Sequence, residues 1–177
     1  PYGAYDDWNT KYYSDIHGDV FNGNGGLRGF KRQNSEGGPR VPMAIYWPGH
    51  IPSGVICNQF VTHIDLIPTF AEMLGIGLNP QYPKDGVSIF STLIDGTPLS
   101  ANRYYVYSSY QGPAIVNNAG FKVRYNMTAK DYDMYYLLND PQERRNIATQ
   151  YPQRFEAMKN QLIKVCGGDI TKGICHY

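Results

Sequence analysis

The sequence lacks several features that would place it in a large class of proteins. It contains no apolar run approaching the roughly 18 residues that a membrane-spanning helix needs. Its net charge of +1 gives no broad positive field to recruit nucleic acid. Charged residues make up 18 % of the 177 residues, below the roughly 25 % of an average globular domain. We therefore expect no membrane span and no nucleic-acid partner.

The start of the chain lacks the marks of a leader peptide. The opening segment PYGAYDDWNTKYY has neither a methionine nor the apolar core of a secretory signal. We interpret the chain as a mature or internal piece of a longer protein.

Cysteine is scarce, with three residues in the chain. Cys166 and Cys175 flank a glycine-rich segment, and their spacing predicts a disulfide that closes a short loop; two free thiols in a loose tail are the alternative. Cys57 is left over, either buried or paired outside this chain. Asn126 opens an Asn-Met-Thr sequon, which predicts N-glycosylation. These features favour an extracytoplasmic address, which would be secreted, lysosomal or periplasmic.

The first hundred residues combine loops with a few regular elements. Residues 1–42 show no strand or helix period and predict loop. The apolar run VPMAIYWPG, residues 41–49, ends in Pro-Gly and predicts a buried strand. Residues 62–75 predict a helix, and a shorter one is expected over about 88–94. The longer helix carries one apolar face, formed by Ile67, Phe70, Ala71 and Leu74.

Four short runs rich in Tyr and Val follow, separated by turn residues. They are RYYVYSSY, AIVNN, GFKVRYNM and DYDMYYLL. The NNAG tetrapeptide between the second and third is typical of a hairpin, and sequential strands with tight links favour an antiparallel sheet. Residues 149–165 predict a helix that packs on one face of this sheet. Its apolar stripe consists of Phe155, Met158, Leu162 and Val165.

These elements predict a chain with two parts that meet near residue 100. Residues 1–100 are expected to be part of an α/β body, with loops, one strand and two helices. Residues 101–177 are a small α+β subdomain, in which a four-stranded antiparallel sheet packs against a C-terminal helix. The predicted fold class is thus an α/β fragment plus an α+β C-terminal subdomain.

The stretch GGLRGFKRQNSEGGPRVP, residues 25–42, raises a question of chemistry. Its glycine pairs exclude a helix, and Pro39 and Pro42 exclude a central strand. It predicts an ordered loop that presents cations. The Lys31 ammonium is a compact charge with three donors, which suits an oxyanion of sulfate or phosphate. A solvated basic loop is the alternative that the residues alone leave open.

This stretch resembles a signature block of the sulfatase family, within the alkaline-phosphatase-like superfamily. LRGFKRQNSEGGPRVPMAIYWPGHIPSG is similar to the family block L-R-G-x-K-x-x-x-x-E-G-G-x-R-V-P…W-P-G-x-I-P-x-G. Three later segments are similar to further blocks in the family's order and spacing: THIDLIPTFAEMLGI, PKDGVSIFSTL and YYLLNDPQERRNIA. The blocks cover most of residues 22–165, so the chain is identified as a C-terminal portion of a member of this family.

The resemblance implies a role for Lys31. In enzymes of this family, the lysine at the matching position contacts the sulfate group and helps neutralise the leaving oxygen. This role agrees with the need for a fixed cation where charge develops during the reaction. His63 is interpreted as a structural histidine, with an approach to the site as the alternative. Other matching residues are assigned to structure: Glu36, Gly37, Gly38 and Arg40 in the loop, and Asp140, Glu143 and Asn146 in a later turn.

The family's nucleophile and metal ligands are missing from this chain. No Cys or Ser in the chain begins a C-x-P-x-R or S-x-P-x-R pattern, whose first residue becomes formylglycine in the family. The Asp residues that bind the divalent metal, calcium in most relatives, are missing too; SDIHGD at residues 14–19 matches that block only superficially. The resemblance therefore implies the N-terminal portion of the same enzyme as a partner, and we expect this chain alone to be inactive.

In the register that the resemblance suggests, residues 1–24 form a loop between the metal site and Lys31. Such a loop would border the substrate pocket, and aromatic faces beside short polar side chains suit sugar sulfates. The expected substrate is a sulfated carbohydrate or an aryl sulfate; an ordinary surface loop is the alternative. The candidates for substrate contact are Tyr12, Tyr13, His17, Asn22 and Arg28.

Two other functions stay open. A phosphodiesterase or phosphonate hydrolase uses the same scaffold, and an upstream Thr or Ser nucleophile without the formylglycine motif would favour it. A non-catalytic glycan-binding or interaction module is the second. Binding of a sulfated glycan without turnover in the full-length protein would favour that module.

Overall fold

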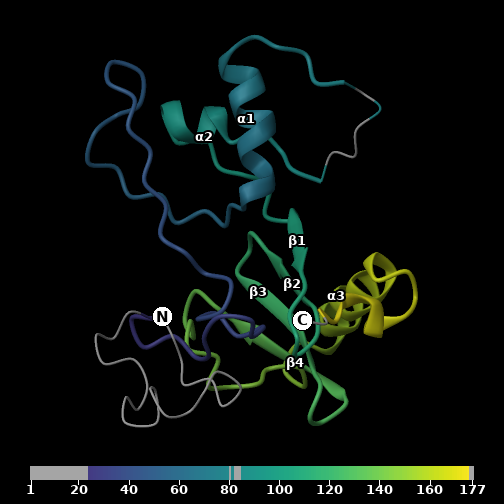
Figure 1. The fold of residues 1–177 in the computed structure, drawn as a ribbon. Helices are drawn as coiled ribbons and strands as arrows, with labels where there is room; N and C mark the ends of the chain where they lie inside the picture. Colours follow the sequence, from purple (N-terminus) through teal and green to yellow (C-terminus); the bar gives the residue numbers. More distant parts are fainter. Residues whose placement is uncertain (1–23, 80, 82–84, 176–177) are drawn as a thin grey trace, which may run out of the picture. The chain divides into compact units, whose positions relative to one another are not determined.

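The computed structural model describes residues 24–79, 81 and 85–175 (Figure 1). Contacts divide the described residues into two compact units. One unit combines 24–41 with 104–116 and 120–175, and the other combines 42–103 with 117–119. One boundary lies between residues 103 and 104, close to the expected residue 100. Residues 24–41, however, belong to the unit of the C-terminal sheet, because buried ion pairs join them to it.

The C-terminal unit is built on a four-stranded sheet in the order β1-β2-β3-β4. Its strands are β1 (Tyr104–Tyr107), β2 (Ala114–Asn117), β3 (Phe121–Asn126) and β4 (Asp131–Tyr136). Strand β3 pairs antiparallel with both β2 and β4. Gly120, with a left-handed φ of 87°, completes the tight turn between β2 and β3. The predicted antiparallel sheet and its hairpin are confirmed.

The two faces of β3 differ in chemistry, because successive side chains point to opposite sides of a strand. Phe121 and Val123 lie on one face, and Lys122 and Arg124 lie on the other. All four side chains are buried. The sheet is therefore covered on both sides, by an apolar layer on one face and by polar groups on the other.

Helix α3 (Pro152–Val165) covers the apolar face, as the sequence predicted. Proline is tolerated in its first turn, where the missing N–H has no helical partner. Met158 and Leu162 of the predicted stripe are buried, whereas Val165 is exposed. Figure 1 shows α3 and the loop of residues 24–41 on opposite sides of the sheet. Among the described residues, no helix is long and apolar enough to cross a membrane.

The predicted disulfide is not formed, because Cys166 and Cys175 are free thiols. Backbone bonds hold the tail instead. Ile174 forms a bridge with Ser109, and the Cys175 amide donates to the Ser109 carbonyl at 3.0 Å. A 3-10 helix, η3 (Ile170–Gly173), precedes this bridge, and the Asp169 side chain caps it. The segment up to Cys175 is thus ordered without the covalent link that the cysteine spacing predicted.

The other unit contains η2 (His63–Asp65), α1 (Leu66–Met73) and α2 (Phe90–Asp95). The buried Asp65 carboxylate organises it, accepting from the Thr62 amide at 2.8 Å and the Val87 amide at 3.0 Å. It also pairs with Arg103. Both predicted helices are present, and one buried carboxylate joins the segments around them.

The prediction of a buried strand over residues 41–49 is wrong for this chain. Residues 41–47 have no regular structure, and Tyr46 is 89 % exposed. A strand needs a neighbour for its backbone N–H and C=O groups, and none lies beside this segment in the described residues. The apolar stripe of α1 is also exposed at Ile67, Phe70 and Leu74.

Candidate functional site

Lys31 lies in a tight turn of the loop formed by residues 24–41. The Gln33 amide donates to the Phe30 carbonyl at 3.0 Å, and the Phe30 amide donates to Gln33 Oε1 at 3.2 Å. Arg32 adopts a left-handed φ of 73°, which is uncommon for a residue with a side chain. These bonds define the backbone that carries Lys31, whose side chain is exposed.

Glycines allow the loop to close tightly behind this turn. The Gly37 amide donates to the Arg28 carbonyl at 2.8 Å. A Cβ on Gly37 would lie 2.1 Å from the Gly29 carbonyl oxygen, and one on Gly38 would lie 2.1 Å from the Gln33 carbonyl oxygen. No side chain fits in such spaces. The structural assignment of Gly37 and Gly38 thus has a steric reason.

Asn34 fastens the loop to the sheet through uncharged bonds. It is 1 % exposed, and its Nδ2 donates to the Tyr125 carbonyl at 2.8 Å and the Gly112 carbonyl at 3.2 Å. The Asn34 carbonyl accepts from the Tyr107 hydroxyl at 3.1 Å. This one residue therefore contacts three separate segments of the C-terminal unit.

A buried ion cluster lies next to Asn34, formed by Glu36, Lys122 and Glu143. Lys122 Nζ is 2.8 Å from Glu36 Oε1 and 2.9 Å from Glu143 Oε1. The other oxygen of Glu143 accepts from the Glu36 amide at 2.8 Å. The Lys122 and Glu143 side chains are 0 % exposed and that of Glu36 is 6 % exposed. Two residues assigned to separate family blocks thus meet at one strand lysine.

The cluster keeps Lys122 charged. Burial by itself would lower the pKa of its ammonium, but the carboxylates of Glu36 and Glu143 raise that pKa above its ordinary value of 10.5. Since the folded pKa of Lys122 is the higher one, its charge stabilises the fold below pH 10.5 wherever Glu36 and Glu143 are ionised, and this contribution is lost as the pH rises through the folded pKa. Burial also raises the pKa of Tyr107, so its hydroxyl stays protonated.

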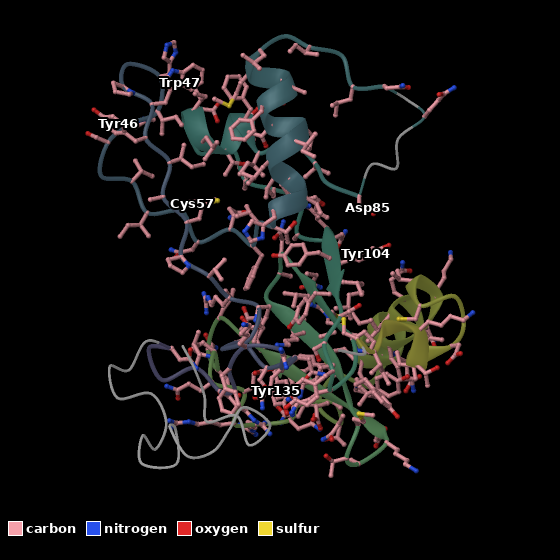
Figure 2. All side chains as sticks on the ribbon, viewed as in Figure 1. Tyr46, Trp47, Cys57, Asp85, Tyr104 and Tyr135 are labelled. Carbon is pink, nitrogen blue, oxygen red and sulfur yellow. The ribbon has the colours of Figure 1, made fainter. Side chains whose placement is uncertain are left out.

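Arg124 makes a second charged contact between sheet and loop. Its Nη1 donates to Ser35 Oγ at 2.7 Å, and its Nη2 lies 3.0 Å from Asp133 Oδ2. Nη2 also donates to the Tyr135 hydroxyl at 3.4 Å. Burial opposes the charge, yet Tyr135, Glu143 and Asp133 raise the pKa of Arg124. Figure 2 shows Tyr135 among nitrogen- and oxygen-bearing side chains.

A polar pocket of about 270 Å³ opens beside this contact. Its lining consists of Arg28, Asn34, Ser35, Gln111, Arg124, Tyr125, Asn126, Met127 and Thr128. Arg28, a candidate for substrate contact, donates through Nη1 to the Glu143 carbonyl at 3.2 Å and the Tyr135 hydroxyl at 3.5 Å. Arg28 thus lines the pocket and also hydrogen-bonds its loop to the residues in and after β4.

The remaining predicted residues have varied positions. Tyr12, Tyr13, His17 and Asn22 lie outside the described residues. His63 begins η2 and is exposed. These positions leave the substrate contacts as predictions.

Asn126 ends β3, and its Nδ2 donates to Asp133 Oδ2 at 3.1 Å. Its glycosylation stays a prediction. The turn assigned to the later family block is present: the Asp140 carboxylate accepts from the Arg144 amide at 3.0 Å, and Asn146 Oδ1 accepts from the Met134 amide at 3.1 Å.

Lys122 and Arg124 were not identified from the sequence. A usable signal was present, because two cations alternate with apolar residues in GFKVRYNM. Such spacing puts both cations on one face of a strand. A central strand with a charged face requires a partner of opposite charge, and Glu36 and Glu143 were among the acids in the recognised blocks.

Calcium was expected to have its ligands outside this chain. Across the ranges that the structure describes, no group of three or more His, Cys, Asp or Glu residues could hold a metal ion. The described residues therefore do not fit a resident metal site.

Comparison with known proteins gives one family and several relatives. The matching family model, N-sulphoglucosamine sulphohydrolase, C-terminal, covers residues 28–167. The chain is 32 % identical over 162 residues to a sulfatase of Formosa agariphila, covering 81 % of this chain and 29 % of that protein. It is 30 % identical over 169 residues to human arylsulfatase A, covering 78 % of this chain and 33 % of that protein.

A solved structure shares the fold. It is described in connection with the metabolism of multiple glycosaminoglycans by Bacteroides thetaiotaomicron. The match has a TM-score of 0.67 and 24 % identity, and covers 80 % of this chain and 32 % of that one. The chain thus spans about a third or less of the length of the proteins that it resembles.

Proposed function

The chain belongs to the N-sulphoglucosamine sulphohydrolase C-terminal family, as a C-terminal portion of a sulfatase-family protein, and from this premise we propose that the whole protein hydrolyses a sulfate ester of a carbohydrate. The family match carries the proposal, because it spans the Lys31 loop and the sheet beneath it. The glycosaminoglycan context of the structural neighbour supports a sulfated sugar as substrate. An aryl sulfate serves as the simplest assay substrate.

In this proposal the chain supplies Lys31. Its ammonium faces the sulfate group and offsets the charge that develops on the leaving oxygen as the S–O bond breaks. The seated loop supports this role, because catalysis needs a cation whose position does not change during the reaction. Arg28, Tyr12, Tyr13, His17 and Asn22 are proposed to contact the sugar.

The nucleophile belongs to the N-terminal portion of the enzyme in this proposal. That portion carries formylglycine and the ligands of a divalent metal, which we take to be calcium. The exposed apolar face of α1 and the unpaired segment of residues 41–47 are consistent with burial against such a partner. The expected location is extracytoplasmic: secreted, lysosomal or periplasmic.

The test is hydrolysis of 4-nitrophenyl sulfate by full-length enzyme with Lys31→Ala. Removing one stabilising group from a developing oxyanion reduces kcat by about 10²–10³-fold, and the thermal unfolding temperature should not change. Lys172→Ala is the matched control, since Lys172 is an exposed lysine in the last turn of η3. Near-normal hydrolysis by Lys31→Ala would refute the role of Lys31.

Assays of the full-length enzyme with other substrates distinguish the proposed function from its alternatives. Faster turnover of an aryl phosphonate or phosphodiester than of the sulfate would assign the protein to phosphoryl chemistry. Binding of a sulfated glycan with no turnover of any ester would make it a binding module.

A further inference from the structure

The ion cluster of Glu36, Lys122 and Glu143 joins three segments that are distant in sequence. They are the loop of residues 24–41, strand β3 and the turn that follows β4. Such clusters add little to stability for their own sake, since well-packed apolar residues of similar volume often serve as well. A contribution to stability therefore does not explain why three charged residues are buried in this small unit. The geometry of the loop of residues 24–41 suggests another role for them.

Glu143 holds both ends of the segment that contains Lys31. Its carbonyl accepts from Arg28 Nη1 at 3.2 Å, on the N-terminal side of Lys31. Its carboxylate accepts from the Glu36 amide at 2.8 Å, on the C-terminal side. The Gly37 amide closes the base of the loop on the Arg28 carbonyl at 2.8 Å. One residue beneath the loop thus fixes the two points between which Lys31 is carried.

Glu143 makes these contacts from a strained backbone. Its φ is 54°, in the left-handed region that residues with side chains rarely adopt. Such a conformation persists only where the surroundings over-determine it. Here the surroundings are the Lys122 ammonium and the amide of Glu36.

We propose that Lys122 and Glu143, with Glu36, are positioning residues that set where the Lys31 ammonium stands. This inference rests on the proposed function, in which Lys31 meets the charge on the leaving oxygen. The three residues do not touch the substrate. They act through the loop, because Lys122 orients Glu36 and Glu143, and Glu143 holds the loop on both sides of Lys31.

The experiment uses full-length enzyme and a series of substituted phenyl sulfates whose phenols rise in pKa. The variants are Lys122→Met and Glu143→Gln. The second keeps the Lys122–Glu36 pair, so we expect it to fold even if the first does not. Lys159→Met is the control, because Lys159 forms an exposed pair with Glu156 on α3. Thermal unfolding reports the folded state of each variant.

We expect losses in kcat that grow with the pKa of the phenol, because a displaced Lys31 matters most when the leaving oxygen carries most charge. For the poorest leaving group, a displacement of about 1 Å corresponds to a loss of about 10²-fold in Lys122→Met, with a smaller loss in Glu143→Gln. Lys31→Ala should show the same trend more steeply, and Lys159→Met should match the wild type.

The possible failures are distinguishable. A uniform loss across the series would mean that the variants only reduce the amount of folded enzyme, and it would overturn the inference. Wild-type rates from folded Glu143→Gln or Lys122→Met would overturn it as well. If Lys31→Ala itself hydrolyses the whole series at the wild-type rate, the proposed role of Lys31 fails, and the inference fails with it.

Discussion

Removing the Lys122 ammonium should destabilise the C-terminal unit strongly. Lys122→Met keeps most of the aliphatic volume but leaves Glu36 and Glu143 without their cation. Because these carboxylates are 6 % and 0 % exposed, water cannot replace the ammonium. Breaking a buried pair in this way typically costs about 3–5 kcal/mol. The control Lys159→Met breaks a pair whose side chains are 24 % and 54 % exposed, for which the expected loss is about 0–1 kcal/mol.

Hydrogen exchange at the amides of β3 in the full-length protein measures this difference where it arises. A loss of 3–5 kcal/mol in opening free energy corresponds to exchange about 10²- to several 10³-fold faster. The triple variant Lys122→Met, Glu36→Gln, Glu143→Gln should recover much of the protection, because no uncompensated charge remains buried. Equal exchange rates in Lys122→Met and Lys159→Met would refute this reasoning.

Three further predictions concern other parts of the chain. Gly37→Ala should lower the free energy of unfolding by about 1–3 kcal/mol, because its Cβ would lie 2.1 Å from the Gly29 carbonyl oxygen. The thermal unfolding temperature should fall for this variant and stay unchanged for Gly77→Ala, since Gly77 has open space around it. Peptide mapping without reduction should recover Cys166 and Cys175 as alkylated free thiols, with slow labelling of Cys166 because burial raises its pKa; a linked peptide would contradict the structure. The hydrogen bond from Thr171 lowers the pKa of Asp169 below 3.8, so its cap on η3 is present above that pH and is lost as the pH falls through the lowered pKa. The Thr171 amide resonance should then titrate below pH 3.8, and a midpoint above that value would sink this interpretation.

Local patterns predicted the elements that form their own contacts within the chain. The four strands lie in runs rich in Tyr and Val, and the hairpin has its turn residues, so the antiparallel sheet could be predicted. Helix α3 was predictable from its stripe, whose central members Met158 and Leu162 are buried. These elements depend on neighbours close in sequence.

Features that depend on distant partners could not be predicted in the same way. The apolar run of residues 41–47 reads as a strand, but the described residues offer no strand beside it. Cys166 and Cys175 have a suitable spacing for a disulfide, yet backbone bonds to Ser109 already hold the tail. The spacing of residues shows which structures a segment can form, and contacts with distant segments determine which of them it does form.

The residues of the candidate site likewise fall into those that the sequence identified and one that depends on a distant partner. The resemblance led to Lys31 and to the acids of two blocks, Glu36 and Glu143. It did not lead to Lys122, because no motif contains it and the pairing joins residues 86 positions apart. A search of the strands for charged faces would have found it.

The most direct test of the central claim is a crystal structure of the full-length protein with bound inorganic sulfate. The account predicts that Lys31 Nζ lies within about 3 Å of a sulfate oxygen, while Lys122 remains between Glu36 and Glu143. A sulfate held in the catalytic pocket with Lys31 directed away from it would contradict the account.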